Sequence, residues 1–198
     1  EDISMINFYW DVEQGTPKWK LLRKGLWTGS VAIRLLQGKS FPREYDFAGN
    51  DATRRGTLLE VASIREYERK YRRKVKRPGF VTNSVYPNAG YSPDGIDGAW
   101  LLESKSFNGE RHDSLAAGKI PLEVQVQILF GMIITGKRKA RLLAYNPDVV
   151  GKEELTVIEV TYEKIIGNRI RKLLRLDLKK RLADGSVADE LGLVRIEA

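Results

Sequence analysis

Residues 92–105 read SPDGIDGAWLLESK, and this stretch decides both the fold and the search for a function. An Asp-Gly pair at 97–98 separates two apolar segments and predicts a tight turn between two strands. Side chains at positions i and i+2 of a strand point to the same face, so Glu103 and Lys105 project together. Asp94, at the end of the neighbouring strand, can lie opposite Glu103. The stretch therefore predicts a hairpin that gathers two acids and a lysine.

Two carboxylates and the backbone carbonyl of Ser104 form a set of hard oxygen ligands of the kind that Mg²⁺ binds. Lys105, beside them, can orient or deprotonate an attacking water, or stabilise the charge that builds on a phosphate. Metal-dependent hydrolysis of a phosphodiester is therefore the first functional hypothesis. The alternative is an ordinary hairpin whose exposed charges pair with one another and contribute little to stability.

The composition limits the classes of function. The 198 residues are 42% hydrophobic and 30% charged, which is typical of one soluble globular domain. The chain has no cysteine and a single histidine, His112. Disulfides, thiolate metal sites and cysteine nucleophiles are thereby excluded, and a histidine-rich metal site is disfavoured. Any metal would be held by carboxylates, which favours Mg²⁺ or Mn²⁺.

The chain is strongly basic. Its 34 Lys and Arg against 26 Asp and Glu give a net charge of +8, and the pI is about 9.6. Long-range attraction to a polyanion follows, and nucleic acid is the commonest such partner; a contribution to solubility alone is the alternative. No run of 18 apolar residues occurs, so we expect no segment that spans a membrane.

Turn residues and hydrophobic periodicity divide the chain into helices and strands. Helices are expected at 15–25, 28–38, 52–73, 122–136 and 163–182. Strands are expected at 75–83, 99–107, 139–147 and 155–162, and a short strand or a turn at 89–95. The first of these strands is assigned to a sheet edge because Pro78 removes a ladder donor, and 39–51 and 106–119 are interpreted as loops. This order predicts an α/β or α+β fold with a central mixed sheet flanked by helices.

Glu60 is an unusual member of the long helix expected at 52–73. Its neighbours at i+4 and i+7 are Ile64 and Tyr67, so it shares a face with apolar residues instead of joining the solvated stripe. A carboxylate on a half-apolar face needs a partner, which can be a basic side chain or a metal ion.

The order of Asp94, Glu103 and Lys105 resembles the PD-(D/E)xK nuclease motif. The wider layout resembles the family of phage lambda exonuclease and YqaJ-type viral recombinases, in five blocks that follow the family's order. The blocks are LLRKGLWTGS (21–30), RGTLLE (55–60), GYSPDG (90–95), LLESKSF (101–107) and the segment from IPLEVQVQ to ITG (120–136). The resemblance implies a restriction-endonuclease-like core, with a central mixed sheet flanked by helices.

The resemblance also implies the roles of the acidic residues and the lysine. Asp94, Glu103 and the Ser104 backbone carbonyl would hold one Mg²⁺, for which Mn²⁺ can substitute. Glu60 would help to hold a second ion, and Lys105 would be the catalytic lysine.

The catalytic set of this family includes a glutamine, which we expect in the helix at 122–136. Counting back from the Thr-Gly pair at 135–136 favours Gln127 over Gln125. The two side chains lie about 200° apart around a helix, so only one of them can face the site. Gln127 would position the attacking water together with Lys105.

Arg23, Thr28 and Ser30 match the residues that bind a terminal 5′-phosphate in this family. Hydroxyl and amide groups at a helix N-terminus, together with an arginine fork, form an anion pocket. Helix capping by Thr28 and Ser30 is the simpler interpretation, and the two roles are compatible. Arg54 and Arg55 either hold a phosphate of the incoming strand or form salt bridges on the helix surface.

Taken together, the resemblance implies a metal-dependent 5′→3′ exonuclease that degrades linear double-stranded DNA during phage recombination by single-strand annealing. It further implies a ring-shaped homotrimer, a single-strand annealing protein as partner, and a phage or prophage protein in the cytoplasm of a bacterial host. We expect a single nuclease domain over 1–198. Its parts would be a helical 5′-phosphate-binding part at about 14–50, a core at about 51–162, and a C-terminal helix and tail at 163–198.

Two other functions stay open from the sequence. One is an endonuclease or end-processing nuclease of the same superfamily, although a Cas4-like enzyme is disfavoured because it would use cysteines that this chain lacks. The other is a DNA-binding module without catalysis, which the intact Asp94, Glu103 and Lys105 disfavour.

Overall fold

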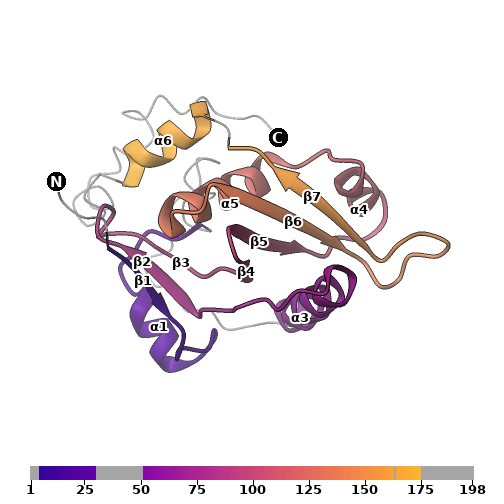
Figure 1. Ribbon diagram of the computed structural model, residues 1–198, viewed down its shortest axis with the longest axis horizontal. Helices are drawn as coiled ribbons and strands as arrows, with labels where there is room; N and C mark the ends of the chain where they lie inside the picture. Colours follow the sequence, from indigo (N-terminus) through magenta and orange to yellow (C-terminus); the bar gives the residue numbers. More distant parts are fainter. Residues whose placement is uncertain (1–4, 30–50, 163, 175–198) are drawn as a thin grey trace.

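The structure is a computed structural model that describes residues 5–29, 51–162 and 164–174 (Figure 1). Its strands are β1 (Ile6–Tyr9), β2 (Phe80–Asn83), β3 (Gly90–Tyr91), β4 (Gly95–Asp97), β5 (Trp100–Lys105), β6 (Lys139–Tyr145) and β7 (Leu155–Val160). Its helices are α1 (Pro17–Arg23), α3 (Asp51–Tyr71), α4 (Gly109–Ala116), α5 (Leu122–Thr135) and α6 (Lys164–Leu174). None of these described helices is long and apolar enough to cross a membrane.

The strands form two sheets. One is antiparallel with the order β1-β2-β3, and the other has the order β4-β5-β6-β7. In the second sheet β5 runs parallel to β6, and the other two pairs are antiparallel. The predicted mixed α/β fold is therefore confirmed, with a smaller sheet added to the mixed one. The chain passes from one sheet to the other at 92–94, where Pro93 has no amide hydrogen to extend the ladder of β3.

Helices cover the mixed sheet on both faces (Figure 1). On one face Leu102 and Leu143 pack with Ile64 and Tyr67 of α3. On the other face the neighbouring residue Leu101 joins the core that α5 provides, and α6 packs against the outer side of α5. Successive side chains of a strand alternate between faces, so one apolar strand supplies both cores.

Two sequence predictions about the fold are wrong, and one strand was missed. The segment at 75–83 is not an edge strand, because Pro78 precedes β2 and β1 pairs with the side of β2 that β3 leaves open. Strand β1 itself was not predicted. The segment at 106–119 contains helix α4, in which His112 and Leu115, three residues apart, are both buried in the core.

Several predicted segments lie partly outside the described residues. The short helix predicted at 28–38 falls there from Ser30 onward, as does the loop predicted at 39–51 up to residue 50. The C-terminal helix predicted at 163–182 is described over Lys164–Leu174, and the residues after it are not described.

Polar contacts fix the position of α3 on the mixed sheet. The hydroxyls of Ser63 and Ser104 lie 2.6 Å apart in the core, and Ser63 Oγ also donates to the Glu60 carbonyl at 2.8 Å. One helical turn further, Tyr67 Oη donates to Asp97 Oδ2 at 2.9 Å. Asp97 therefore anchors the helix in addition to its place beside the turn. These bonds set the rotation of α3, and with it the direction of Glu60.

Two glycines test the packing of the helices. A methyl group at Gly131 of α5 would lie 2.5 Å from Tyr91 Cζ and 2.8 Å from Leu101 Cδ2, whereas one at Gly56 of α3 meets nothing within 4 Å. We expect Gly131→Ala to lower the free energy of unfolding by about 1–3 kcal/mol through overpacking. The matched control Gly56→Ala should raise it by about 0.5–1 kcal/mol through helix propensity. Urea unfolding measures both, and equal stabilisation by the two variants would contradict the close contact between α5 and Tyr91.

Candidate active site

Glu103 lies at the centre of the candidate site. Its side chain is 1% exposed, and it accepts hydrogen bonds from three side chains. Tyr91 Oη donates to Oε2, Gln127 Nε2 donates to Oε1, and Lys105 Nζ donates to Oε1 at 2.7 Å. The donors come from β3, α5 and β5, so one carboxylate joins three elements. Charge-assisted bonds of this kind hold a buried carboxylate in one orientation.

Asp94 lies beside Glu103, at the crossing between the two sheets. The register of β4 and β5 pairs Gly95 with Leu102, which brings the preceding Asp94 next to Glu103. Asp94 Oδ2 accepts the backbone N–H of Ser104 at 2.7 Å. The N–H and C=O of one strand residue point to the same side, so the Ser104 carbonyl is also directed to this side, past the end of β4. The structure thus brings together the three oxygen donors named from the sequence.

The site concentrates negative charge out of water. Burial raises the pKa of the Asp94 carboxyl well above its ordinary value, and the charges of Glu103 and Glu60 raise it further. Burial alone would lower the pKa of Lys105, but Glu103, Asp94 and Glu60 outweigh this effect and the pKa is raised. Lys105 is therefore protonated here, and it balances only part of the negative charge. A like-charged cluster of this kind favours the binding of a further cation.

Glu60 has a protein partner in this structure. Arg77 Nη2 donates to Glu60 Oε1, and Arg77 Nε donates to the Asp94 carbonyl at 2.9 Å. Burial raises the pKa of Glu60, while the charge of Arg77 opposes the shift. Of the two partners that the sequence left open for Glu60, the structure shows the basic side chain.

Sequence reasoning missed both Arg77 and Tyr91. Arg77 ends the basic run at 68–77, where nothing local separates it from the other cations; only the need of Glu60 for a partner pointed to such a residue. Tyr91 belongs to the segment GYSPDG but was considered only as part of a strand. Burial, followed by the charges of Glu103 and Asp94, raises the pKa of Tyr91 well above its ordinary value, so it stays a hydrogen-bond donor.

The donor set suits one hard cation. Mg²⁺ is commonly held by one or two carboxylates, with waters and substrate phosphates completing its shell. Asp94 and Glu103 provide two carboxylates, and Ser104 adds a backbone carbonyl oxygen. Across the described ranges 5–29, 51–162 and 164–174, no three His, Cys, Asp or Glu side chains form a group that could hold a metal by themselves. Glu60, the third acid nearby, is hydrogen-bonded to Arg77.

The two glutamines of α5 have different surroundings. Gln127 contacts Glu103, whereas Gln125 Nε2 donates to the Ile120 carbonyl at 2.8 Å, at the start of its own helix. The structure therefore places Gln127, which the sequence favoured, in the site.

The segment around Thr28, which precedes the nuclease core in the sequence, lies next to the candidate site. The backbone of Trp27 pairs with residues 88–90, and Thr28 is buried. A methyl group at Gly29 would lie 3.4 Å from Gln127 Cγ, so the chain here lies against the catalytic candidates. Ser30, the next candidate of the 5′-phosphate group, lies outside the described residues.

The three arginine candidates are placed differently. Arg23 lies in the last turn of α1, with its guanidinium carbon 4.0 Å from the centroid of the Trp19 ring. Arg55 forms an exposed salt bridge with Asp148 at 3.1 Å, which is the surface role left open from the sequence. Arg54 lies within α3, but its side chain is outside the described part of the structure.

Solved structures share the fold. The crystal structure of LHK-Exo in complex with dAMP is 21% identical, covers 86% of this chain and 96% of its own, and superposes with a TM-score of 0.70. The crystal structure of an alkaline exonuclease, LHK-Exo, from Laribacter hongkongensis is 19% identical, covers 85% and 95%, and gives a TM-score of 0.69. At sequence identities this low, the superpositions establish similarity of fold alone.

Comparison at the level of sequence gives the family. No curated protein sequence matches the chain significantly. The family model described as the YqaJ-like viral recombinase domain matches residues 26–138, which is more than half of the chain. The matched range includes Glu103 and the three side chains that donate hydrogen bonds to it. The chain belongs to the YqaJ-like viral recombinase domain family.

Proposed function

We propose that this protein is a metal-dependent 5′→3′ exonuclease that degrades linear double-stranded DNA. The observation that carries the proposal is the buried pair of Asp94 and Glu103, with Lys105 and Gln127 both directed at Glu103 Oε1. A chain of net charge +8 in a viral recombinase family is consistent with a DNA substrate.

The residues that would hold the metal are Asp94, Glu103 and the backbone carbonyl of Ser104. The ion would be Mg²⁺, with Mn²⁺ as a substitute, and when bound it would supply Lewis-acid stabilisation of the charge on the phosphate. Glu60 would serve a second ion only after release from Arg77. The freed Arg77 guanidinium would then be available to a phosphate oxygen.

The side chains around Glu103 would orient the reacting groups. Lys105 Nζ and Gln127 Nε2 converge on one carboxylate oxygen, so an attacking water beside Glu103 lies within reach of both donors. Because Lys105 is protonated, its role is to donate to the water or to a phosphate oxygen and so to stabilise negative charge. Tyr91 keeps Glu103 in place through the other carboxylate oxygen.

The polarity of digestion would come from the segment near Thr28. Gly29, beside Thr28, lies against Gln127, so this segment is close enough to the site to present backbone amides and hydroxyls to an anion there. Arg23, Thr28 and Ser30 would there hold the 5′-phosphate that each cleavage creates, so that the next phosphodiester lies at Glu103. Arg54 and Arg55 would contact the incoming strand, and for Arg55 this requires release from Asp148.

The proposed setting follows from membership of the family. The protein would act as a ring-shaped homotrimer with a single-strand annealing protein, in the cytoplasm of a bacterial host and as a phage or prophage product. An endonuclease is the second candidate, because the same acids and lysine would serve hydrolysis within a strand.

The choice of substrate separates the two candidates. With Mg²⁺ present, we expect rapid digestion of a linear duplex with 5′-phosphate ends, slower digestion with 5′-hydroxyl ends, and none of a covalently closed circle. The reason is that only a free 5′-phosphate can occupy an anion pocket next to the site. Gel analysis over time measures all three, and cutting of the closed circle would exclude an exonuclease.

We expect substitution of Asp94 to abolish metal binding and to raise the stability of the metal-free protein. A raised carboxyl pKa means that the folded protein holds this proton more tightly than the unfolded chain does. The metal-free protein therefore loses stability as pH rises above the ordinary value of 3.8. At pH 8 with chelator, Asp94→Asn should raise Tm by about 2–4 °C, which corresponds to about 1 kcal/mol. The amide oxygen can still accept the Ser104 N–H.

The same variant should lose the rise in Tm that Mg²⁺ gives the unchanged protein, because a ligand that binds only the folded state stabilises it. Asp113→Asn, in an exposed pair with Lys152, is the control and should keep that rise. A normal response of Asp94→Asn to Mg²⁺ would show that Asp94 is not a ligand.

Removal of Arg77 should leave Glu60 available to a cation. We expect Arg77→Ala to lower the stability of the metal-free protein by about 1–3 kcal/mol, since a charge-assisted bond is lost. The rise in Tm on adding Mg²⁺ should then be larger than in the unchanged protein. Arg69→Ala, which removes an equal charge from the exposed pair with Glu66, should leave that rise unaltered. Thermal unfolding with and without Mg²⁺ measures both effects. An identical rise in Tm in Arg77→Ala and in the unchanged protein would rule out a role of Glu60 in metal binding.

A further inference from the structure

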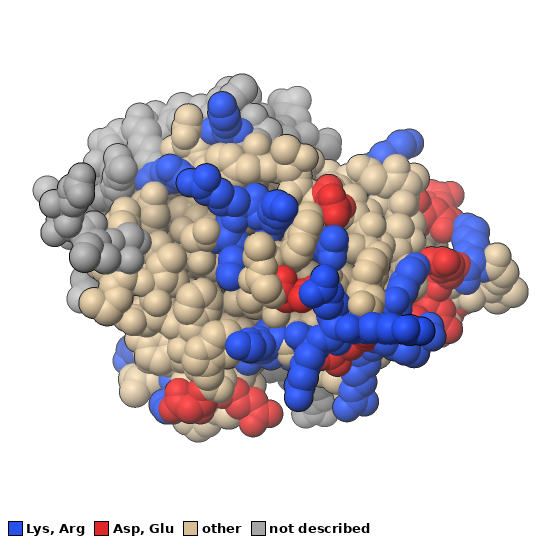
Figure 2. Space-filling view, in the orientation of Figure 1, with Lys and Arg blue, Asp and Glu red and all other residues tan. Residues whose placement is uncertain are grey.

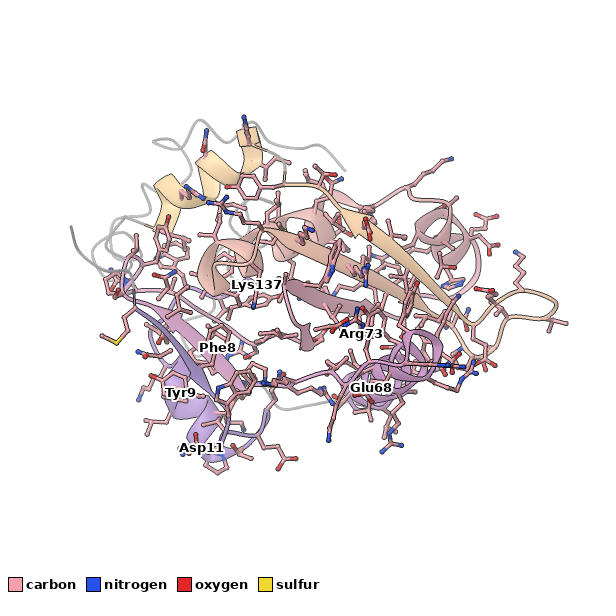
Figure 3. All side chains as sticks on the ribbon, viewed as in Figure 1. Phe8, Tyr9, Asp11, Glu68, Arg73 and Lys137 are labelled. Carbon is pink, nitrogen blue, oxygen red and sulfur yellow. The ribbon has the colours of Figure 1, made fainter. Side chains whose placement is uncertain are left out.

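A cleft of about 230 Å³ opens on the surface between the two sheets. We call it the aromatic–lysine cleft; its lining includes Phe8, Trp10, Ile96, Lys74, Lys76 and Lys137. Figure 3 labels Phe8 on β1 and Lys137, which follows the end of α5. Among the described residues, none of those proposed for catalysis lines the cleft.

Two stacked aromatic rings form one wall of the cleft. The rings of Phe8 and Trp10 lie 5.5 Å apart between centroids, with an angle of 12° between their planes. Phe8 lies in β1 and Trp10 in the turn that follows it, and the stacking shows that both rings lie on the same side of the chain. Trp10 is 53% exposed, whereas Trp19 and Trp27 are buried. A flat aromatic surface that is already ordered and open to solvent can stack against a nucleobase.

Three lysines surround these rings. Lys76 Nζ lies 5.9 Å from the centroid of the Trp10 ring, and Lys137 Nζ donates to the Gly98 carbonyl at 2.8 Å. No acidic residue lines the cleft, and within the described ranges Lys74, Lys76 and Lys137 form no salt bridge. Figure 2 shows Lys and Arg side chains gathered over the middle of the same face, from the region of α3 toward α6. Cations without acidic partners attract the phosphates of a nucleic acid strand.

The cleft is joined to the candidate active site by a short, hydrogen-bonded piece of backbone. Lys76 and Ile96 exchange two backbone hydrogen bonds, at 2.9 and 2.8 Å. The next residue, Arg77, contacts Glu60 and the Asp94 carbonyl in the site. Ile96 of the cleft lies in β4 and follows Asp94 of the site by only two residues. One DNA molecule can therefore reach both places.

We propose that the aromatic–lysine cleft binds single-stranded DNA beside the nuclease site. The inference rests on the proposed exonuclease function, because digestion of one strand leaves its complement unpaired, with bases free to stack on Trp10. Charge favours this occupant over a second copy of the chain. A polyanion complements three lysines, whereas another copy carries a net charge of +8 itself.

Binding without hydrolysis tests the proposal. The probe is a fluorescein-labelled 12-nucleotide oligo(dT) with a 5′-hydroxyl, added to the full chain in EDTA and followed by fluorescence anisotropy. We expect Trp10→Ala to weaken binding about tenfold, because one base loses its stacking partner. Trp10→Phe keeps an aromatic ring and should retain most of the affinity. Unchanged affinity in folded Trp10→Ala would overturn the proposal.

Salt dependence tests the lysines separately. For single strands the slope of log K against log salt changes by about 0.7 for each phosphate contact, so Lys74→Ala with Lys76→Ala should reduce it by about 1.4. Lys152→Ala, on the loop between β6 and β7, should leave slope and affinity unaltered. An unaltered slope in the double variant would contradict phosphate binding in the cleft.

Two further readouts separate this proposal from its alternatives. If Trp10→Ala lowers the mass in solution without changing oligo(dT) affinity, the cleft is an interface between copies of the chain and the proposal is wrong. Digestion of a 5′-phosphorylated duplex is measured in parallel with Mg²⁺. Trp10-dependent binding without digestion would support the cleft while contradicting the exonuclease; digestion without Trp10-dependent binding would overturn the cleft alone.

Discussion

The burial of the Glu103 carboxylate is the constraint on which the rest of the structure depends. A polar side chain at 1% exposure is costly unless its oxygens have hydrogen-bond partners, and here the partners come from three elements. Tyr91 ties in the small sheet, Gln127 ties in α5, and Lys105 belongs to the same strand. The packing of the two sheets and of α5 is therefore restricted to arrangements that keep these hydrogen bonds to Glu103.

The second constraint is the concentration of acids around that carboxylate. Asp94 and Glu60 both have raised pKa values in part because of Glu103, so the folded protein carries repulsion that a stability optimum would avoid. Buried pairs of like charge of this kind are typical of functional sites. Polar contacts on the opposite face of the sheet, such as Ser63 with Ser104 and Tyr67 with Asp97, hold α3 against the sheet in spite of the repulsion.

Local rules predicted the parts of the site that lie close together in the sequence. The period of two along β5 placed Glu103 with Lys105, the Asp-Gly turn placed Asp94 beside them, and helical geometry allowed only one of Gln125 and Gln127 into the site.

Partners distant in sequence could not be predicted. Strand β1 pairs with β2 across more than 70 residues, and although it contains strand-forming residues, its four positions are too few to predict that pairing. Arg77 is one of many cations in a basic run, and only the three-dimensional approach of α3 to the Asp94 crossing selects it for Glu60. Helix α4 was missed because its few core contacts, among them His112 and Leu115, lie in a polar segment.

We propose that the acids, the lysine and the glutamine around Glu103 form one metal-binding nuclease centre. Crystals of the full chain grown with Mn²⁺ would locate the ion by its anomalous scattering. We predict one strong peak within ligating distance of Asp94, Glu103 and the Ser104 carbonyl, and loss of that peak in Asp94→Asn. A peak elsewhere on the chain, or none at a Mn²⁺ concentration that supports DNA digestion, would contradict it.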